Sequence, residues 1–122
     1  ALRHLSAARI KSDRSPFGAA LETFVLSELL KLVAAHDEPL EAFHFRDRYG
    51  AEVDFVLEDA RANVIGIEVK AAATVTGKDF NGLRKLQQAA GKRFIAGFVL
   101  HDSDLTVPFG DSLTALPVST LL

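Results

Sequence analysis

The chain has 122 residues and a formal net charge of −2 at pH 7, and 48% of its residues are apolar, which is the profile of one globular domain with its own core. It has no cysteine, which excludes disulfides, thiol nucleophiles and cysteine zinc sites, and no apolar run approaches the roughly 20 residues that span a bilayer. The sequence therefore predicts a cytoplasmic protein with no membrane partner, and its charge argues against a free-standing, tight nucleic-acid binder.

The beginning of the chain indicates a domain cut from a longer protein, because there is no methionine, even at position 1. Residues 1–14 are weakly patterned and predict an arm or the remnant of a preceding region, and residues 15–122 predict a single domain. A helix is expected from Ser15, a good N-cap, and Pro16, which suits the first helical position. It is expected to end near Pro39, and its apolar side chains recur at helical spacing: Phe17, Leu21, Phe24, Val25, Leu29 and Leu32.

Two strands joined by a turn are predicted next. Residues 41–46 alternate, with two phenylalanines on one face and His44 on the other. Residues 52–58 alternate again after a turn at 48–50. The pattern predicts that the second of these strands points three apolar side chains inward: Val53, Phe55 and Leu57.

The second half of the chain predicts a strand, a helix and two more strands. Residues 64–72 alternate, and a helix follows from about Thr76, with Gly91 as its C-cap. Residues 94–100 are an apolar run, typical of a strand inside a sheet. Residues 105–109 contain a proline, which favours an edge strand.

Two acids and a lysine stand out in the second and third predicted strands. Glu68 precedes Lys70 by two positions, so both project on one face, and Asp54 joins them if the two strands pair as a hairpin. Two carboxylates and an ammonium at one place are costly to assemble without a cation or substrate, which suggests metal-dependent chemistry. The alternative is an amphipathic hairpin whose polar face is only solvated, with Lys70 paired to one acid.

In this order of elements, the residues resemble the PD-(D/E)XK nuclease superfamily. Its signature is an acid on the second core strand, Glu-x-Lys on the third and often a Glu on the first helix; Asp54, Glu68 and Lys70 match the strand positions, and Val53 replaces the proline. The chain is more closely similar to an uncharacterised C-terminal domain that follows an AAA-type ATPase module in many bacterial and archaeal proteins. Five segments in order carry that resemblance: 18–25, 27–31, 43–47, 52–56 and 67–71.

The resemblance implies an α/β (α+β) fold, with a restriction-endonuclease-like αβββαβ core whose mixed central sheet is flanked by helices. It implies a nuclease that hydrolyses DNA with Mg²⁺ or Mn²⁺ bound by Asp54, Glu68 and the main-chain carbonyl of Val69, oxygen ligands that suit these ions. Lys70 would orient the attacking water or stabilise charge on the phosphate. The implied partners are DNA and an N-terminal ATPase module of the same parent chain; a homo-oligomer is left open. The alternative function is a non-catalytic domain that binds nucleic acid or a partner and regulates the ATPase.

The accessory acid of the first helix is either Glu22 or Glu28. Glu22 follows Gly18 by four positions, a spacing that resembles the first helix of archaeal Holliday-junction resolvases, and the small residues at 18–20 would let the helix approach the sheet. By helical angle Glu28 falls within the apolar stripe and Glu22 at its margin. Glu22 is favoured as a catalytic acid and metal ligand, with a surface glutamate of no role as a third explanation.

Basic residues gather on and just after the second predicted helix. Three of them are the predicted phosphate contacts, although a solvated face is the ordinary explanation of such a run: Arg84, Lys85 and Lys92. His44, alone on a strand, is expected to be structural or exposed.

Overall fold

The computed structural model describes residues 16–121, so the predicted arm at 1–14 and the N-cap at Ser15 lie outside the described residues. Helices and strands up to residue 110 follow the predicted order, but the structure has three strands after the second helix where two were predicted. Short 3₁₀ helices are labelled η. The elements are α1 (Pro16–Ala35), β1 (Leu40–Arg46), β2 (Glu52–Asp59), β3 (Val64–Val69), η2 (Gly77–Phe80), α2 (Asn81–Ala90), η3 (Gly91–Arg93), β4 (Phe94–His101), β5 (Val107–Gly110), β6 (Leu113–Pro117) and η4 (Val118–Leu121).

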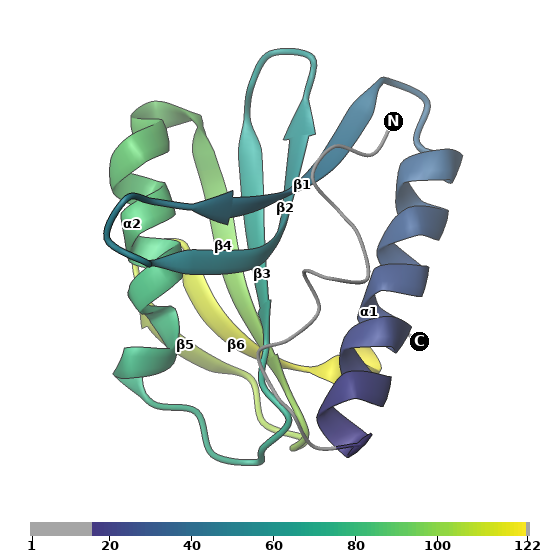
Figure 1. Cartoon of the computed structure of the whole chain (residues 1–122), viewed down its shortest axis with the longest axis vertical. Helices are drawn as coiled ribbons and strands as arrows, with labels where there is room; N and C mark the ends of the chain where they lie inside the picture. The colour runs from purple at the N-terminus through teal and green to yellow at the C-terminus, as the bar shows by residue number, and fades with distance from the viewer. Residues whose placement is uncertain (1–15, 122) are drawn as a thin grey trace.

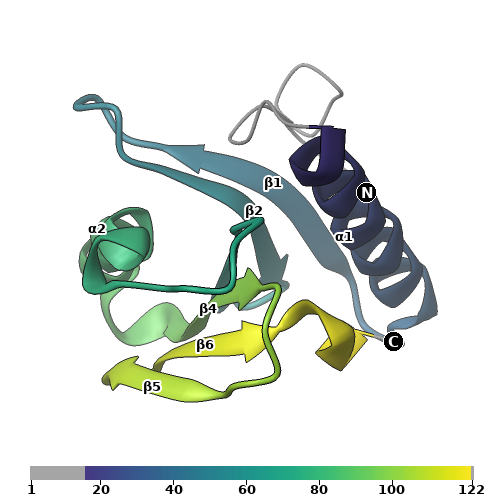
Figure 2. The same ribbon diagram turned by 90° about the horizontal axis from the view of Figure 1, so that it is seen from below.

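Six strands form one mixed sheet in the order β1-β2-β3-β4-β6-β5. The pairs β1–β2, β2–β3 and β5–β6 are antiparallel, whereas β3–β4 and β4–β6 are parallel. The helix α1 packs on one face of the sheet and α2 on the other (Figures 1 and 2). The chain therefore has a mixed α+β architecture, with β4 inside the sheet and the proline-containing β5 at its edge, as the sequence predicted.

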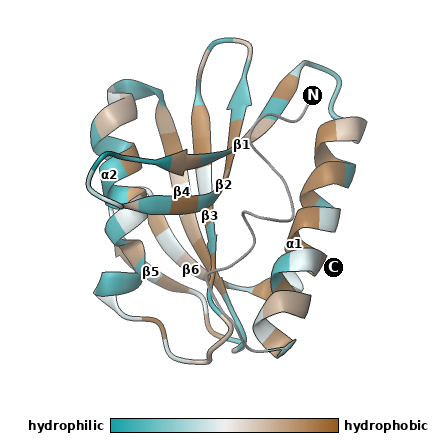
Figure 3. Ribbon diagram, viewed as in Figure 1, coloured by the Kyte–Doolittle hydropathy of each residue, from teal (hydrophilic) through white to brown (hydrophobic). Residues whose placement is uncertain are grey.

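The sheet separates two apolar cores. Figure 3 shows hydrophobic residues along the strands and α1, and hydrophilic residues at the β1–β2 turn. The α2-side core includes Val53, Val56, Val64, Phe80, Leu83, Leu86, Phe94, Val99 and Leu113. The α1-side core includes Leu21, Val25, Leu29, Phe55, Ile67, Val69 and Leu100. Within residues 16–121, no helix is both long and apolar enough to cross a membrane.

An irregularity in β2 changes which side chains point to which core. Between its pairs with Val56 and Val53, β1 advances by two residues while β2 advances by three, so β2 carries one extra residue at positions 54–55. Strict alternation is lost there: Val53 packs in the α2-side core, whereas Phe55 and Leu57 pack in the α1-side core. The prediction that these three point to one face is wrong, because a bulge leaves no signal in the apolar pattern.

The buried stripe of α1 also differs from the predicted one. Phe17 and Leu32 were expected to point inward, but each is 51% exposed. The stripe that meets the sheet consists of Gly18, Leu21, Glu22, Val25 and Leu29. Of the small residues at 18–20, which were expected to let the helix approach the sheet, only Gly18 is buried, and Ala19 and Ala20 are exposed.

The β1–β2 hairpin extends beyond the sheet on the side of α2; its turn overlaps that helix in Figure 1 and stands clear of it in Figure 2. Gly82 of α2 makes a contact with β2 possible, because a Cβ atom there would overlap the main-chain carbonyl of Glu52 at the start of β2. The bulge and this close approach together determine where the hairpin lies.

Replacing Gly82 by alanine should therefore destabilise the protein. The added Cβ has to displace backbone, so we expect a loss on the order of 1–3 kcal/mol in the free energy of unfolding, measured by urea titration. Gly77→Ala is the matched control, since a Cβ at Gly77 meets nothing within 4 Å. Equal stability of the two variants would contradict the close approach.

Candidate functional site

The antiparallel ladder between β2 and β3 ends where the two predicted acids meet. Its pairs run from Glu58–Val64 to Phe55–Ile67. In the same register, the next pair would be Asp54 and Glu68. The hairpin thus brings the two acids opposite each other, as the sequence analysis expected.

Beyond this end of the ladder, carboxylate side chains accept the main-chain hydrogen bonds between the two strands. The main-chain N–H of Asp54 donates to Oε1 of Glu68 at 2.5 Å, and the main-chain N–H of Val69 donates to Oδ2 of Asp54 at 2.9 Å. Each carboxylate therefore accepts a hydrogen bond from the opposite strand, in place of a ladder carbonyl. The side chain of Asp54 is buried and that of Glu68 is partly buried.

The third acid near this pair is Glu22. It is only 1% exposed, and its negative charge adds to the increase that burial causes in the pKa values of Asp54 and Glu68. Glu28 instead pairs with Lys31 at 2.9 Å on the helix surface. The prediction that Glu28 lies in the buried stripe and Glu22 at its margin is wrong, because α1 meets the sheet through Gly18 and the residues one turn later.

Burial dominates the electrostatics of the two strand acids. It raises the pKa of Asp54 to about 7, against the hydrogen bond from Val69 N–H, and the charge of Glu22 adds to the increase. Burial likewise raises the pKa of Glu68 well above its ordinary value, with the charge of Asp54 as the next cause. The cluster therefore carries more negative charge than its surroundings stabilise, and binding a proton or a cation would relieve it.

Lys70 follows directly after β3 and does not bond to either strand acid. Its ammonium donates to Oδ2 of Asp79 at 2.7 Å, while its main-chain N–H donates to the carbonyl of Leu100. The predicted third strand reaches residue 72, but β3 ends at Val69 because the chain turns, with Ala72 N–H bonded to the Lys70 carbonyl. Of the three predicted groups, the two carboxylates lie opposite each other, and the ammonium is bonded to Asp79 of η2.

Within residues 16–121, no set of three or more acidic or histidine side chains is already arranged to hold a metal ion. Asp54 and Glu68 each commit one carboxylate oxygen to a main-chain N–H, and the other oxygen of each is not part of those bonds. A cation would therefore require these side chains to rearrange.

Asp79 was not among the predicted site residues. Partial burial favours a higher pKa of Asp79, but the hydrogen bond from Lys70 keeps that pKa below its ordinary value. The same carboxylate oxygen accepts the main-chain N–H of Thr76 at 2.7 Å, and Asp79 N–H donates back to the Thr76 carbonyl. The spacing Thr-x-x-Asp could have indicated this local turn, whereas the bond to Lys70 depends on tertiary structure.

Two residues of the β1–β2 hairpin form a polar contact with each other. His44, expected to be structural or exposed, is buried, and its Nε2 lies 3.4 Å from Oε1 of Glu52. The charge of Glu52 contributes to the raised pKa of Asp54. The sequence contained no signal for this arrangement, because the bulge decides which hairpin residues face the acids.

The predicted phosphate contacts are exposed residues on and after α2. Arg84 donates from Nη2 to the carbonyl of Phe109 at 3.1 Å, which fixes its side chain against β5. Lys85 lies on α2 and Lys92 on η3, and both are exposed.

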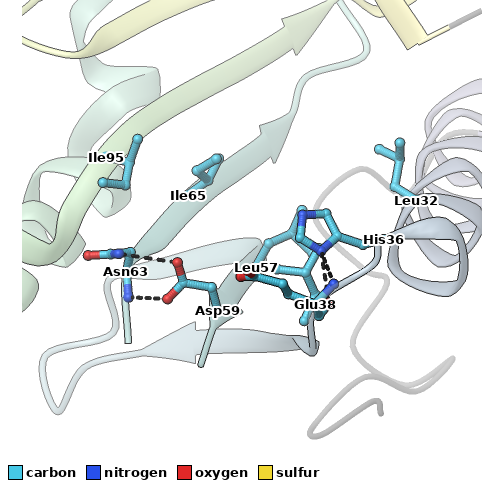
Figure 4. Close-up of a pocket in the computed structure, with 9 residues that line it drawn as sticks. Leu32, His36, Glu38, Leu57, Asp59, Asn63, Ile65 and Ile95 are labelled. Atoms are coloured by element: carbon cyan, nitrogen blue, oxygen red, sulfur yellow. Dashed lines mark hydrogen bonds between the residues drawn. The ribbon is translucent and has the colours of Figure 1, made fainter. Parts of the chain in front are cut away.

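A mostly apolar cavity of about 410 Å³ lies at the other end of the β2–β3 ladder (Figure 4). Leu32, Leu57, Ile65 and Ile95 supply its apolar lining, and none of the predicted site residues borders it. Its Asp59 accepts hydrogen bonds from the main-chain N–H groups of the adjoining turn, as well as from an asparagine side chain, Asn63. The polar groups there stabilise the turn, so the cavity carries no evident chemistry.

A family model for "Domain of unknown function (DUF4143)" matches residues 17–121. The chain belongs to this family. The DUF4143 domain is uncharacterised and is often found with AAA-type ATPases, which agrees with the closer of the two resemblances seen in the sequence. No curated protein and no solved structure matched the chain.

The raised pKa of Asp54 predicts a pH-dependent stability of this DUF4143 domain. The folded pKa is about 7 and the ordinary value is 3.8, so the folded chain binds more protons between these pH values and becomes less stable as pH rises through them. Asp54→Asn should therefore raise the free energy of unfolding at pH 8, by on the order of 2 kcal/mol, and change it little at pH 4. Urea unfolding at both pH values measures this.

Asp59→Asn provides a control of opposite sign, because hydrogen bonds from Asn63 and Arg61 keep the pKa of Asp59 below its ordinary value. That variant should gain no stability at pH 8. An equal gain for Asp54→Asn at pH 4 and pH 8 would assign the effect to packing and contradict the titration.

Proposed function

We propose that this DUF4143 domain is a divalent-metal-dependent phosphodiesterase of the PD-(D/E)XK class that cleaves DNA. The observation that supports it is the facing pair of Asp54 and Glu68, which accept hydrogen bonds from each other's strands with the buried Glu22 nearby. Buried acids that raise one another's pKa values cost stability, and such acids are frequent at functional sites. The restriction-endonuclease-like core is part of the proposal.

The acids fit a hard cation. Carboxylate oxygens, with the main-chain carbonyl of Val69, are the ligands that Mg²⁺ and Mn²⁺ prefer. Burial raises the pKa values of Asp54 and Glu68, and a bound cation would favour their charged forms. Such an ion would polarise the phosphodiester and make a bound water more acidic.

The chain's own groups would have separate tasks. Asp54, Glu68 and Glu22 would hold the ion, and the ammonium of Lys70 would stabilise charge on the phosphate or orient the water. The ammonium of Lys70 donates a hydrogen bond of 2.7 Å to Oδ2 of Asp79, just before α2, so the Lys70 side chain is ordered before the substrate binds. The exposed basic residues of α2 and η3 would bind phosphates on either side of the cleaved bond. An AAA-type ATPase module of the same parent protein would be the partner.

Metal binding and cleavage test the proposal together. Calorimetric titration of the wild-type chain with Mn²⁺ or Mg²⁺ at pH 7.5 should show one ion site that Asp54→Asn abolishes. Labelled DNA should be cleaved only with the ion present. Alanine at Asp54, Glu68 or Lys70 should lower the rate by a factor on the order of 10²–10³.

Glu22→Gln and Glu28→Gln form a matched pair on one helix. The first should weaken ion binding roughly 10–100-fold, because a ligand charge is lost, and the second should leave it unchanged. Cleavage that survives alanine at all three strand positions would refute the assignment. Ion binding that is absent or insensitive to Asp54→Asn would favour the alternative, a non-catalytic domain that binds nucleic acid or regulates the ATPase.

The basic residues predict a salt dependence of DNA binding. Lys85→Ala and Lys92→Ala should each weaken affinity and lower the slope of log K against log salt by about one, since each contact releases counterions. Fluorescence anisotropy with EDTA present, at several salt concentrations, measures the slope without cleavage. Lys31→Ala is the control, because Lys31 pairs with Glu28 on α1. Unchanged slopes would assign Lys85 and Lys92 to ordinary solvation.

A further inference from the structure

The turn of the β1–β2 hairpin presents an aromatic ring to solvent. Tyr49 is 83% exposed, the largest value among the exposed large hydrophobic residues of the described chain. The guanidinium carbon of Arg48 lies 5.9 Å from the centre of the ring. A ring and a cation therefore stand together at the end of the hairpin.

The turn that carries this ring is held by hydrogen bonds. Oδ1 of Asp47 accepts the main-chain N–H groups of Tyr49 and Ala51, at 2.9 and 2.8 Å. Asp47 N–H also donates to the Ala51 carbonyl, and Gly50 adopts φ +91°, which glycine tolerates best. The ring is thus attached to an ordered backbone, so little backbone entropy is lost when a ligand binds to it.

The hairpin connects the ring to the candidate site. Asp54 lies on β2, five residues after Tyr49 of the turn, so the two are at most roughly 17 Å apart. The hairpin extends on the side of α2 and touches it where Gly82 meets Glu52 (Figures 1 and 2). A strand bound along the basic residues of α2 and at the acids would pass within reach of the ring.

The chemistry of the turn fits a nucleobase. Aromatic faces stack on bases of any sequence, and an adjacent guanidinium favours phosphate or a second stacked base. In a continuous duplex both faces of a base are covered by its neighbours, so only an unpaired base offers a face. We propose that Tyr49 is a stacking platform for an unpaired nucleobase, so that the substrate class is DNA with a single-stranded segment beside the cleaved bond. The link to cleavage rests on the proposed function, whereas the stacking itself does not.

The ring can be observed directly, because the chain has one tyrosine and no tryptophan. All tyrosine emission of the 122-residue chain therefore comes from Tyr49. With EDTA present, a single-stranded 12-mer of DNA should quench this emission. The same strand without bases, and a blunt duplex of the same length, should bind without quenching.

Substitutions complete the test. Tyr49→Ala should weaken binding of the single strand roughly 5–150-fold and leave duplex affinity unchanged, while Tyr49→Phe should retain affinity. Circular dichroism checks the fold, which an exposed side chain should not affect. Equal affinity of wild type and Tyr49→Ala for the single strand, or equal quenching by the strand without bases, would overturn the stacking proposal.

The outcomes also separate this proposal from the nuclease assignment. If Tyr49-dependent binding of single strands is found but neither ion binding nor cleavage, the nuclease proposal fails and the platform stands. If ion-dependent cleavage is found and prefers blunt duplexes regardless of Tyr49→Ala, the nuclease proposal stands and the platform fails.

Discussion

The site depends on two carboxylates that replace main-chain acceptors where β2 and β3 separate. Asp54 accepts the N–H of Val69, and Glu68 accepts the N–H of Asp54, so both acids are held by backbone of the opposite strand. They lie where the regular β2–β3 ladder ends at the pair Phe55–Ile67, next to the extra residue that β2 carries in its pairing with β1. Without them, two buried N–H groups would lack acceptors, at a cost on the order of 1–3 kcal/mol each. The same bonds orient the acids and stabilise the sheet.

The burial of these acids close together disfavours their charged forms. Desolvation raises the pKa values of Asp54 and Glu68, and the buried Glu22 increases both shifts. A chain selected for stability alone would place neutral residues here, so the acids are a local conflict of the kind expected at a functional site. The nearby positive charge of Lys70 does not resolve it, because that ammonium is bonded to Asp79.

One hairpin relates most of the features that matter. Its β2 strand carries Asp54, its β1 strand carries the buried His44, and its turn presents Tyr49. The first residue of β2, Glu52, packs on Gly82 of α2. A strand that is bent by a bulge can contribute to a buried acid cluster and reach the opposite helix as well. The positions of acids, lysine and exposed ring are therefore coupled through the backbone.

The sequence by itself determined the order and type of the elements up to residue 110, the edge position of β5 and the pairing that brings Asp54 to Glu68, because alternation, turns and helix caps are local properties. It did not predict β6, which lies between β4 and β5 in the sheet. It did not reveal the bulge, which divides Val53 from Phe55, nor the rotation of α1 that buries Glu22 and leaves Glu28 paired at the surface. The partner of Lys70 was equally hidden, since Asp79 reaches it only when η2, which precedes α2, packs beside the end of β3. Tertiary structure decided these points, because each depends on how closely two backbones approach, and a residue pattern carries no information on that distance.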